Sequence, residues 1–377
     1  MKKLIIVTTV PLSLSTLIKG QPKYLNQFFD ISLITSKDKV NEDISDYEEV
    51  ELIGIDMTRQ ITPLQDLKSL FKLYRYFRQS KVEIVYSFTP KAGLLSMIAS
   101  FFARVPKRAH NIVGMPLMEA SGNKKRLLKF IERTTYFFST NLFCNSYGLK
   151  EYIEKNLTKK EIKVIANGSI NGVDINFFKD TFSDLEKKNK RKELGIEEDD
   201  FVLLFVGRVV KDKGVNELIE AFTILEKNFD NIKLLIVGDF EEELSPISKQ
   251  SIKSMQNNQN IISVGFQKDI RSYLSVSSLF VLPSYREGLP NSLIEAGSFG
   301  IPLLATDING CNEVIIPNKT GVLVKKKSVD SLVTGIQLLI EDKKLYNSIH
   351  NNVRKLTVDR YSQEFFFNSL KDELEKL

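Results

Sequence analysis

The chain has 377 residues, of which 42% are hydrophobic and 27% charged, a balance that excludes a disordered chain and allows two domains with full cores. Its two cysteines, Cys144 and Cys311, lie far apart without a nearby histidine or a Cys-x-x-Cys spacing, which excludes a disulfide framework and a zinc-type ligand set. The longest uncharged apolar stretch, residues 92–103, is too short to cross a bilayer, so we expect no transmembrane helix.

The net charge of +6 is divided unevenly along the chain. Residues 1–168 hold 26 Lys and Arg against 16 Asp and Glu, whereas residues 169–377 hold 27 against 31. A basic first half suits nucleic acid, an anionic membrane surface or a phosphorylated substrate, and a solvated surface is the remaining alternative.

Strand-like and helical segments alternate through the first half, which is typical of a doubly wound α/β domain. The chain begins like a signal peptide, but threonines and serines soon break the apolar run, so we expect a first β-strand there. The expected strands are 4–9, 31–35, 49–52, 84–87, 108–112, 142–144 and 163–165, with helices that include 63–79 and 92–103.

A polar interval from about 175 to 199 then interrupts the pattern, and a second alternating series begins at Phe201. Its expected strands are 201–206, 233–237, 261–264, 270–276, 279–282, 302–305 and 321–324. Its expected helices are 215–227, one near 244–256 and one after Pro290. We therefore expect an N-terminal domain over 1–175, a linker over 176–200, a second domain over 201–355, and a C-terminal helix over 356–377 that packs back on the first domain. Two Rossmann-like halves would hold a ligand in the cleft between them, at the carboxyl ends of the strands.

The first loop of the second half, Gly207–Gly214, carries two candidate cations. The guanidinium fork of Arg208 and the point charge of Lys213 together suit a diphosphate, and a solvated charged turn is the alternative. Neither a Walker P-loop nor a G-x-G-x-x-G pattern is present, so the usual sign of nicotinamide binding is missing. Gly238 and Gly265, at the ends of two later strands, would clear space for a nucleotide.

Two carboxylates eight residues apart, Glu287 and Glu295, flank the start of the helix expected after Pro290. Asn291 and Ser292 would supply capping oxygens at this start. Glu287 would then lie before the helix and Glu295 about one turn inside, near free N–H groups that suit an anion. Taken alone, two ordinary surface acids would give the same pattern.

Several motifs together resemble glycosyltransferase family 4, whose members are retaining enzymes with the GT-B fold. They are Gly-Arg and Lys-Gly within 207–214, IVGD at 236–239, VGF at 264–266, LPSYREGLPNSLIEAGSFGIPLLAT at 282–306, and the closing NEVI and TGVLV. The resemblance implies an α/β fold of two Rossmann-like doubly wound domains facing a central cleft. It also implies a C-terminal domain that binds the donor and an N-terminal, membrane-facing domain that binds the acceptor.

The resemblance also implies roles for individual residues. Arg208 and Lys213 would hold the donor diphosphate, Glu295 the ribose hydroxyls, and Glu287 the donor sugar. The N–H groups of Gly288 and Leu289 would lie near the sugar or phosphate. The remaining substrate contacts expected in this half are Gly207, Gly238 and Asn291.

The family implies a mechanism without a bound metal or other cofactor. The sequence agrees, since it has no Asp-x-Asp at an expected strand end and only two histidines. Charge on the leaving diphosphate would then fall to Arg208, Lys213 and helix dipoles. Front-face attack, with the leaving phosphate helping to deprotonate the acceptor, is what the resemblance implies, so we name no covalent nucleophile.

The first half resembles the family less tightly. Where related enzymes carry a glycine-rich loop only Gly20 remains, so Lys19, Ser13 or Ser15 are alternatives for contacting the donor sugar. Thr89, Lys91 and Gly93 would begin a helix at the cleft. His110, at the end of an expected strand, is a candidate catalytic group beside acceptor or donor sugar, and a packed histidine is the alternative.

Residues 86–116 and 143–174 look like the subgroup that builds capsular and other surface polysaccharides on polyprenyl-linked acceptors. The implied partners are a nucleotide-diphosphate sugar, uridine-based by our prediction, and a lipid-linked saccharide, with the enzyme cytoplasmic and peripheral at the inner face of the cell membrane.

The segment 123–138 bears on this location. Lys125, Lys129 and Arg133 align on a helix, and an apolar stripe is formed by Leu127, Phe130, Ile131, Thr134 and Phe138. The helix could face the core with a solvated basic side, or dock on an anionic leaflet, as the basic first half favours.

Three other functions remain open. A GT-B epimerase acting on a nucleotide-diphosphate sugar would share the fold and an acidic pair, and a non-catalytic subunit of a polysaccharide assembly complex would share the fold alone. Nucleic-acid binding is the third, but no recognised module appears and there is no Trp for stacking; we therefore expect no nucleic-acid partner.

Overall fold

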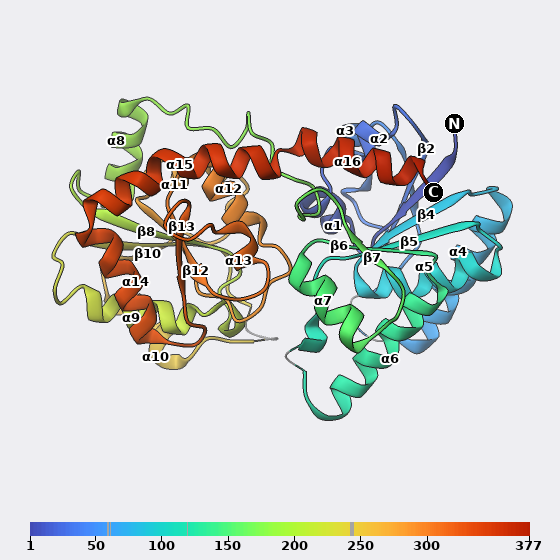
Figure 1. The fold of residues 1–377 in the computed structure, drawn as a ribbon, viewed down its shortest axis with the longest axis horizontal. Coiled ribbons are helices and arrows are strands. Elements are labelled where there is room, and N and C mark those ends of the chain that lie inside the picture. Colours follow the sequence, from blue (N-terminus) through green and yellow to red (C-terminus); the bar gives the residue numbers. More distant parts are fainter. Residues whose placement is uncertain (59, 61, 119, 242–244) are drawn as a thin grey trace. The chain divides into compact units, whose positions relative to one another are not determined.

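The computed structural model describes residues 1–377 except 59, 61, 119 and 242–244 (Figure 1). The chain forms two compact units: unit 1 is Met1–Gly172 with Gln363–Leu377, and unit 2 is Val173–Ser362. The chain enters and leaves unit 2 side by side, because the N–H of Val173 donates to the carbonyl oxygen of Tyr361. Residues 176–200, expected to be a linker, lie within unit 2, where a capping box of Ser183 and Glu186 begins helix α8 (Asp184–Glu193).

Unit 1 is built on a parallel sheet of seven strands in the order β3-β2-β1-β4-β5-β6-β7. The strands are β1 (Lys3–Val7), β2 (Asp30–Thr35), β3 (Glu51–Gly54), β4 (Ile84–Phe88), β5 (Lys107–Ile112), β6 (Asn141–Cys144) and β7 (Ile162–Val164). All seven expected strands are present. Such strands read as continuous apolar runs because helices cover both faces of the sheet.

The helices of unit 1 lie in two layers. They are α1 (Pro11–Leu17), α2 (Gln21–Leu25), α3 (Asn41–Glu48), α4 (Pro63–Gln79), α5 (Pro90–Phe102), α6 (Gly122–Phe138), α7 (Tyr147–Asn156) and α16 (Gln363–Glu375), with a 3-10 turn η1 (Pro116–Met118). On one face Ile5 and Val85 pack with Leu73 of α4 and Ala92 of α5. On the other face Leu4, Ile6 and Tyr86 pack with Leu14 of α1 and Phe366 of α16, because alternate strand residues point to opposite faces.

Unit 2 holds a second parallel sheet, in the order β10-β9-β8-β11-β12-β13. Its strands are β8 (Phe201–Val206), β9 (Ile232–Val237), β10 (Ile261–Ser263), β11 (Leu279–Leu282), β12 (Leu303–Thr306) and β13 (Gly321–Val324). Around them lie α8, η2 (Lys211–Lys213), α9 (Val215–Leu225), α10 (Lys249–Asn257), α11 (Arg271–Leu274), α12 (Asn291–Phe299), α13 (Cys311–Val314), α14 (Val329–Glu341) and α15 (Lys343–Tyr361).

Two expectations for unit 2 differ from the structure. The apolar segment 270–276 carries the short helix α11 instead of a strand. The helix expected near 244–256 begins at Lys249, and position 244 lies outside the described residues.

The C-terminal segment expected as one helix over 356–377 is divided between the units. Helix α15 ends at Tyr361 in unit 2, and α16 packs against α2 in unit 1, where Phe366, Leu370 and Leu374 are buried. Within the described ranges no helix combines the length and the apolar character that a bilayer crossing requires.

Candidate active site

The candidate site of unit 2 lies where the strand order of its sheet reverses. Strands β8 and β11 are neighbours there, although they are not consecutive in the chain. In open α/β sheets ligands bind beyond the carboxyl ends of the strands at such a point. The two loops that leave these ends are 207–214 and 283–290, which contain Arg208, Lys213 and Glu287.

Two glycines let the site loops come together. A Cβ on Gly214 would lie 2.0 Å from the carbonyl oxygen of Pro283, and a Cβ on Gly310 would lie 2.0 Å from that of Gly288. Both glycines also have positive φ, 72° and 80°, a conformation that side chains disfavour. The loops after β8, β11 and β12 therefore meet at one place.

Lys213 and Glu287 form an ion pair at this place. The Nζ atom of Lys213 lies 2.6 Å from Oε1 of Glu287, and the side chains are 22% and 12% exposed. Arg286 beside them pairs with Asp212 at 2.9 Å. The two expected donor-site loops thus hold each other through opposite charges.

Asn309, which we did not expect from the sequence, supports the Glu287 loop. Its amide Nδ2 donates to the carbonyl oxygens of Glu287 at 2.9 Å and Gly288 at 3.3 Å. The hydroxyl of Thr306 donates to the carbonyl oxygen of Ser284 at 2.6 Å. The available signal was the position of Asn309, a polar residue just after strand β12.

The start of helix α12 lacks a side-chain cap. Pro290 occupies the N-cap position and no side chain caps the helix, so the capping predicted for Asn291 and Ser292 is wrong. Within the described part of the chain, the N–H groups of Gly288, Leu289 and Asn291 have no acceptor. Unsatisfied N–H groups at a helix N-terminus, together with its dipole, attract anions.

Glu295 lies one turn inside α12 and is half-buried. Burial raises the pKa of its carboxyl from 4.5 to about 7. Over the described residues no side chain pairs with it. A half-buried carboxyl without a protein partner can accept hydrogen bonds from ligand hydroxyl groups.

Arg208 extends from the end of β8 into solvent, where it is 54% exposed and paired with Glu241. Gly207 and Gly238 end adjacent strands, and a Cβ on Gly238 would lie 1.9 Å from the carbonyl oxygen of Gly207. This close approach requires glycine at 238. The structure therefore brings Lys213 against Glu287, whereas Arg208 contacts a different acid, which the sequence did not indicate.

In unit 1, His110 is packed inside the fold. It is 2% exposed, and its Nδ1 lies 2.9 Å from the hydroxyl of Ser87. A Cβ on Gly93 would lie 2.4 Å from the imidazole, so the glycine of α5 lies directly against the ring. Burial lowers the pKa of His110 to about 4, so the ring is neutral at pH 7. A neutral imidazole can donate one hydrogen bond and accept another.

Gly20 begins α2 in the left-handed conformation, with φ of 79°. Its N–H donates to Oε1 of the buried Glu48 at 2.7 Å, and the N–H of Lys23 donates to the other oxygen at 3.2 Å. The N–H of Gly20 is therefore already occupied. The ammonium of Lys19 lies over the ring of Tyr47, 4.9 Å from its centre.

The helix start expected at Thr89 to Gly93 is present as the beginning of α5. Thr89 has a φ of 68°, rare for a β-branched residue, and its hydroxyl lies 2.7 Å from that of Thr9. Lys91 is held by Asp66 at 2.7 Å. The loops after β1 and β4 are thus joined at the point where the strand order of unit 1 reverses.

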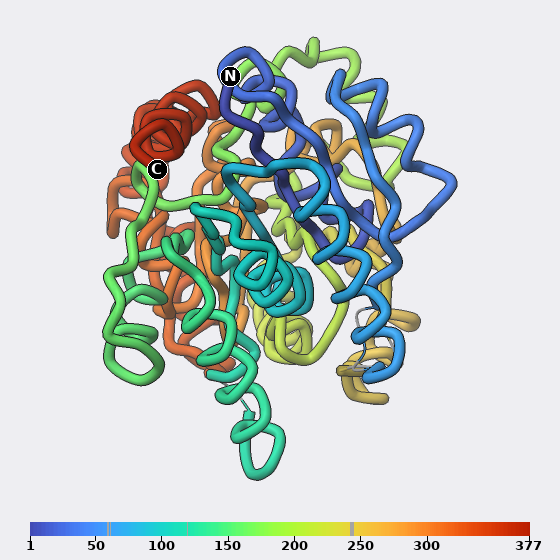
Figure 2. The backbone as a smooth tube through the Cα atoms, turned by 90° about the vertical axis from the view of Figure 1, so that its right-hand side faces the viewer, coloured from blue at the N-terminus to red at the C-terminus, as the bar shows by residue number. Residues whose placement is uncertain are grey.

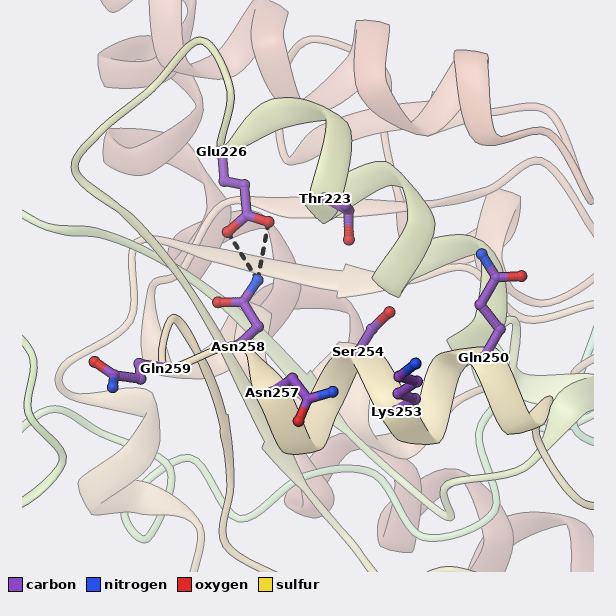
Figure 3. A pocket seen from close by; sticks show the side chains of 8 residues that line it. All are labelled: Thr223, Glu226, Gln250, Lys253, Ser254, Asn257, Asn258 and Gln259. Carbon is purple, nitrogen blue, oxygen red and sulfur yellow. Dashed lines mark hydrogen bonds between the residues drawn. The ribbon is translucent and has the colours of Figure 1, made fainter.

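A separate surface hollow of about 490 Å³ lies between α9 and α10. Only polar side chains line it, among them Glu226 and Asn258, whose amide donates to both carboxylate oxygens (Figure 3). It contains none of the expected site residues. In the described parts of the chain no group of three or more His, Cys, Asp or Glu could hold a metal ion; metal independence stays a prediction.

Comparison with known proteins identifies the family. Residues 186–356 match the family described as glycosyl transferases group 1, and residues 23–168 match the glycosyl transferase 4-like domain. The capsular polysaccharide biosynthesis glycosyltransferase CapM of Staphylococcus aureus is 32% identical over 358 residues, covering 94% of this chain and 92% of that protein. The Escherichia coli UDP-Gal:alpha-D-GlcNAc-diphosphoundecaprenol alpha-1,3-galactosyltransferase is 29% identical over 351 residues, covering 92% of this chain and 89% of that protein.

The fold agrees with this assignment. The crystal structure of Anabaena HepE in complex with UDP and glucose superposes with a TM-score of 0.82 at 19% identity, covering both chains completely. The two parallel-sheet units thus share the fold of this solved structure. The chain belongs to glycosyltransferase family 4, with the GT-B fold, and the capsular polysaccharide glycosyltransferase CapM is among its relatives.

Proposed function

We propose that this glycosyltransferase moves a hexosyl or N-acetylhexosaminyl unit from a uridine-diphosphate sugar to a polyprenyl-diphosphate-linked glycan, with retention at the anomeric carbon and without a bound metal. The observation that carries the proposal is the pairing of Lys213 with Glu287 beside the uncapped start of α12. A cation, free N–H groups and two carboxylates in one place suit a ligand with both phosphates and hydroxyls.

We assign each group one part of the donor. Lys213 and Arg208 take the diphosphate, and Glu295 takes the ribose hydroxyls. Glu287 takes the transferred sugar, and the N–H groups of Gly288 and Leu289 lie near the sugar or phosphate. The support is chemical: Glu295 is a half-buried carboxyl without a partner, and a diol would supply the hydrogen bonds that it lacks.

Donor binding must then rearrange the ion pair. Glu287 neutralises Lys213 at 2.6 Å; a diphosphate beside Lys213 would compete for its ammonium and release the Glu287 carboxylate to accept from sugar hydroxyls. Arg208 would likewise exchange Glu241 for phosphate, at little cost because the pair is exposed. The two loops of the site are therefore joined by the same charges that would bind the donor.

We propose the following transfer step. The bond between the anomeric carbon and the diphosphate oxygen breaks, the acceptor hydroxyl oxygen bonds to that carbon on the same face, and its proton passes to the leaving diphosphate. Negative charge grows on the diphosphate during this step. Lys213, Arg208 and the positive end of α12 would stabilise it, which is electrostatic catalysis by groups already in place.

The acceptor and the location rest on relatives. The E. coli relative is named for a diphosphoundecaprenol acceptor, and a Campylobacter jejuni relative, 27% identical over 331 residues, is named an N,N'-diacetylbacillosaminyl-diphospho-undecaprenol alpha-1,3-N-acetylgalactosaminyltransferase. We propose that this chain takes the same class of acceptor and acts in the cytoplasm, peripherally at the inner face of the cell membrane.

The test is release of uridine diphosphate, measured with and without a polyprenyl-diphosphate sugar. We expect release that depends on the lipid acceptor. Conversion of the donor to its epimer without acceptor would support an epimerase instead. Intact donor binding with neither activity would support a non-catalytic subunit. A screen of donor sugars by shift in melting temperature would then identify the sugar.

A further inference from the structure

Loop 283–290 is fastened to the loop that leaves the neighbouring strand β8. The N–H of Tyr285 donates to the carbonyl oxygen of Asp212 at 2.8 Å, and two residues further on Glu287 forms its ion pair with Lys213. In the proposed function a donor diphosphate takes the ammonium of Lys213, which breaks the ion pair. Another anchor is then needed to keep loop 283–290 in place.

The side chain of Tyr285 makes a contact that involves no donor-binding group. It is 7% exposed, and its hydroxyl donates to Oε1 of Glu217 at 2.5 Å. Glu217 lies in the first turn of α9, the helix into which the chain runs directly from loop 207–214 (Figure 2, yellow-green). Burial, followed by the Glu217 contact, raises the pKa of Tyr285 well above its usual value of 10, so the phenol keeps its proton and remains the donor.

The Glu217 carboxylate is only half used. Its Oε2 is buried and has no hydrogen-bond partner among the residues that the structure describes. A buried polar oxygen without a donor costs free energy, and an apolar pair of similar size would avoid that cost. A costly polar contact beside the donor-binding loops therefore indicates a role other than stability.

A third segment also reaches Tyr285. Lys327 lies in the loop between β13 and α14, and its ammonium stands 4.5 Å from the centre of the Tyr285 ring. Helix α14 packs against α9 (Figure 1). Tyr285 thus contacts loop 207–214, the start of α9 and the loop after β13, although it stands only two residues before Glu287.

We propose that Tyr285 is a positioning residue for the transferred sugar. Its hydrogen bond to Glu217 holds loop 283–290 in place after Lys213 has turned from Glu287 to the donor diphosphate, so that the Glu287 carboxylate stays within reach of the sugar hydroxyls. Tyr285 acts through Glu287 and contacts no substrate itself. The inference rests on the proposed function, since it needs Glu287 at the transferred sugar.

Kinetics of Tyr285→Phe, which removes the hydroxyl and keeps the ring, test this role. Loss of a hydrogen bond to a charged group corresponds to about 10-fold to 100-fold, so kcat/KM for the UDP-sugar that the melting screen selects should fall by that factor. The KM for the acceptor should not change, nor should the affinity for UDP, which has no sugar for Glu287 to contact.

Tyr346→Phe is the matched control. It removes a hydroxyl that donates to the carbonyl oxygen of Ser278 at 2.9 Å. Ser278 precedes strand β11, whereas loop 283–290 follows it, so the control breaks a bond of the same kind at the opposite end of the strand. It should leave kcat/KM unchanged.

Variants of Glu217 separate positioning from stability. Glu217→Gln keeps an oxygen that accepts from the phenol and should retain most of the kcat/KM. Glu217→Leu should lose as much as Tyr285→Phe, and the double variant no more than either, because all three lack the same bond. The double variant should nevertheless melt above Tyr285→Phe, because it leaves no unpaired carboxylate. Glu226→Leu, which breaks the bonds of another α9 carboxylate to Asn258, should stay fully active.

Hydrogen exchange tests the anchor without any donor. Lys213→Gln breaks the ion pair as a diphosphate would, and the amide of Tyr285, whose N–H donates to Asp212, reports whether the loop stays in place. We expect slow exchange in Lys213→Gln, and exchange faster by about 10-fold to 100-fold once Tyr285→Phe is added. Tyr346→Phe added to Lys213→Gln should not accelerate it.

Three results would overturn the proposal. They are an unchanged kcat/KM in Tyr285→Phe, an equal loss in Tyr346→Phe, and slow exchange of the residue 285 amide in Lys213→Gln with Tyr285→Phe. Failure of the proposed function looks different. The exchange rates would then follow the expectation, while the wild type would neither bind a UDP-sugar nor release uridine diphosphate.

Discussion

Glu295 links the stability of unit 2 to pH. Its pKa is raised from 4.5 to about 7 by burial, so the folded chain binds the proton more tightly than the unfolded one. The stabilising effect of the protonated form is complete below pH 4.5 and is lost as pH rises through 7. Glu295→Gln should therefore unfold with nearly the same free energy as the wild type at pH 4.5, and be more stable by on the order of 1–3 kcal/mol at pH 8. Denaturant titrations at both pH values measure the free energy of unfolding of each protein. The same difference between variant and wild type at pH 4.5 and at pH 8 would contradict the prediction.

Nucleotide binding should respond to the same carboxyl. Ribose hydroxyls donate to the ionised form, so the affinity for UDP-glucose, which has no titrating phosphate near pH 7, should rise between pH 6 and pH 8. Glu295→Gln should bind more weakly and with a flat pH profile. Isothermal titration at several pH values gives both quantities, and a variant with wild-type affinity would remove Glu295 from the ribose site.

Arg208 should matter for turnover and little for folding. It is 54% exposed and paired with Glu241, and exposed ion pairs contribute at most about 1 kcal/mol. Loss of one group that stabilises transition-state charge lowers kcat by about 100-fold to 1,000-fold. Arg208→Ala should show that loss with an unchanged melting temperature, whereas Arg271→Ala, which breaks an ion pair with Asp269, should keep full activity. An active Arg208→Ala enzyme would sink the diphosphate assignment.

Among the elements of unit 2, the loop that contains Gly310 packs closely against the loop that contains Glu287. Gly310 and Gly300 both have positive φ, 80° and 104°, so alanine strains the backbone at either. At Gly310 the new Cβ would also lie 2.0 Å from the carbonyl oxygen of Gly288, whereas at Gly300 its nearest neighbour is 3.9 Å away. Gly310→Ala should therefore displace the Glu287 loop and lower kcat/KM for the donor, while Gly300→Ala loses only stability. Steady-state kinetics beside thermal melts separate the two effects, and equal kinetics would contradict the loop contact.

The elements themselves were largely predictable from the sequence. Continuous apolar runs such as Phe201–Val206 indicate strands of a parallel sheet, and Pro63–Gln79 matches its helix at both ends. The strand predicted over 270–276 is wrong because a short apolar run fits helix and strand equally well. The helix cap predicted from Asn291 is wrong because Pro290 occupies the N-cap position.

Partners across the chain were less predictable than elements. The motifs indicated Lys213 and Glu287 as site residues, but not their contact, which depends on how Gly214 lets two loops meet. Likewise His110 lies near the end of an expected strand in the sequence, and only packing against Gly93 shows that it is buried. Long-range pairs depend on tertiary structure, which local patterns do not encode.

At the scale of the whole molecule, unit 1 depends on the last helix of the chain. Leu370 of α16 is fully buried in the core of unit 1, whereas Phe365 on the same helix is 43% exposed. Leu370→Ala should lower the stability of unit 1 by about 2–5 kcal/mol through the lost contacts and the cavity, and Phe365→Ala should have little effect. Calorimetry should show one transition shifted by Leu370→Ala and the transition of unit 2 unmoved; a shift of both would mean that the units unfold together.

Transfer with retention can be measured directly. The enzyme, treated with a chelator, is given an α-linked UDP-sugar labelled with ¹³C and a polyprenyl-diphosphate-linked saccharide, and the anomeric configuration of the product is determined by NMR together with the amount of uridine diphosphate released. We predict an α-linked product, formed in equal amount to the released diphosphate and lost in Lys213→Gln. A β-linked product, a requirement for added metal, or an isomerised donor without transfer would contradict the proposed reaction.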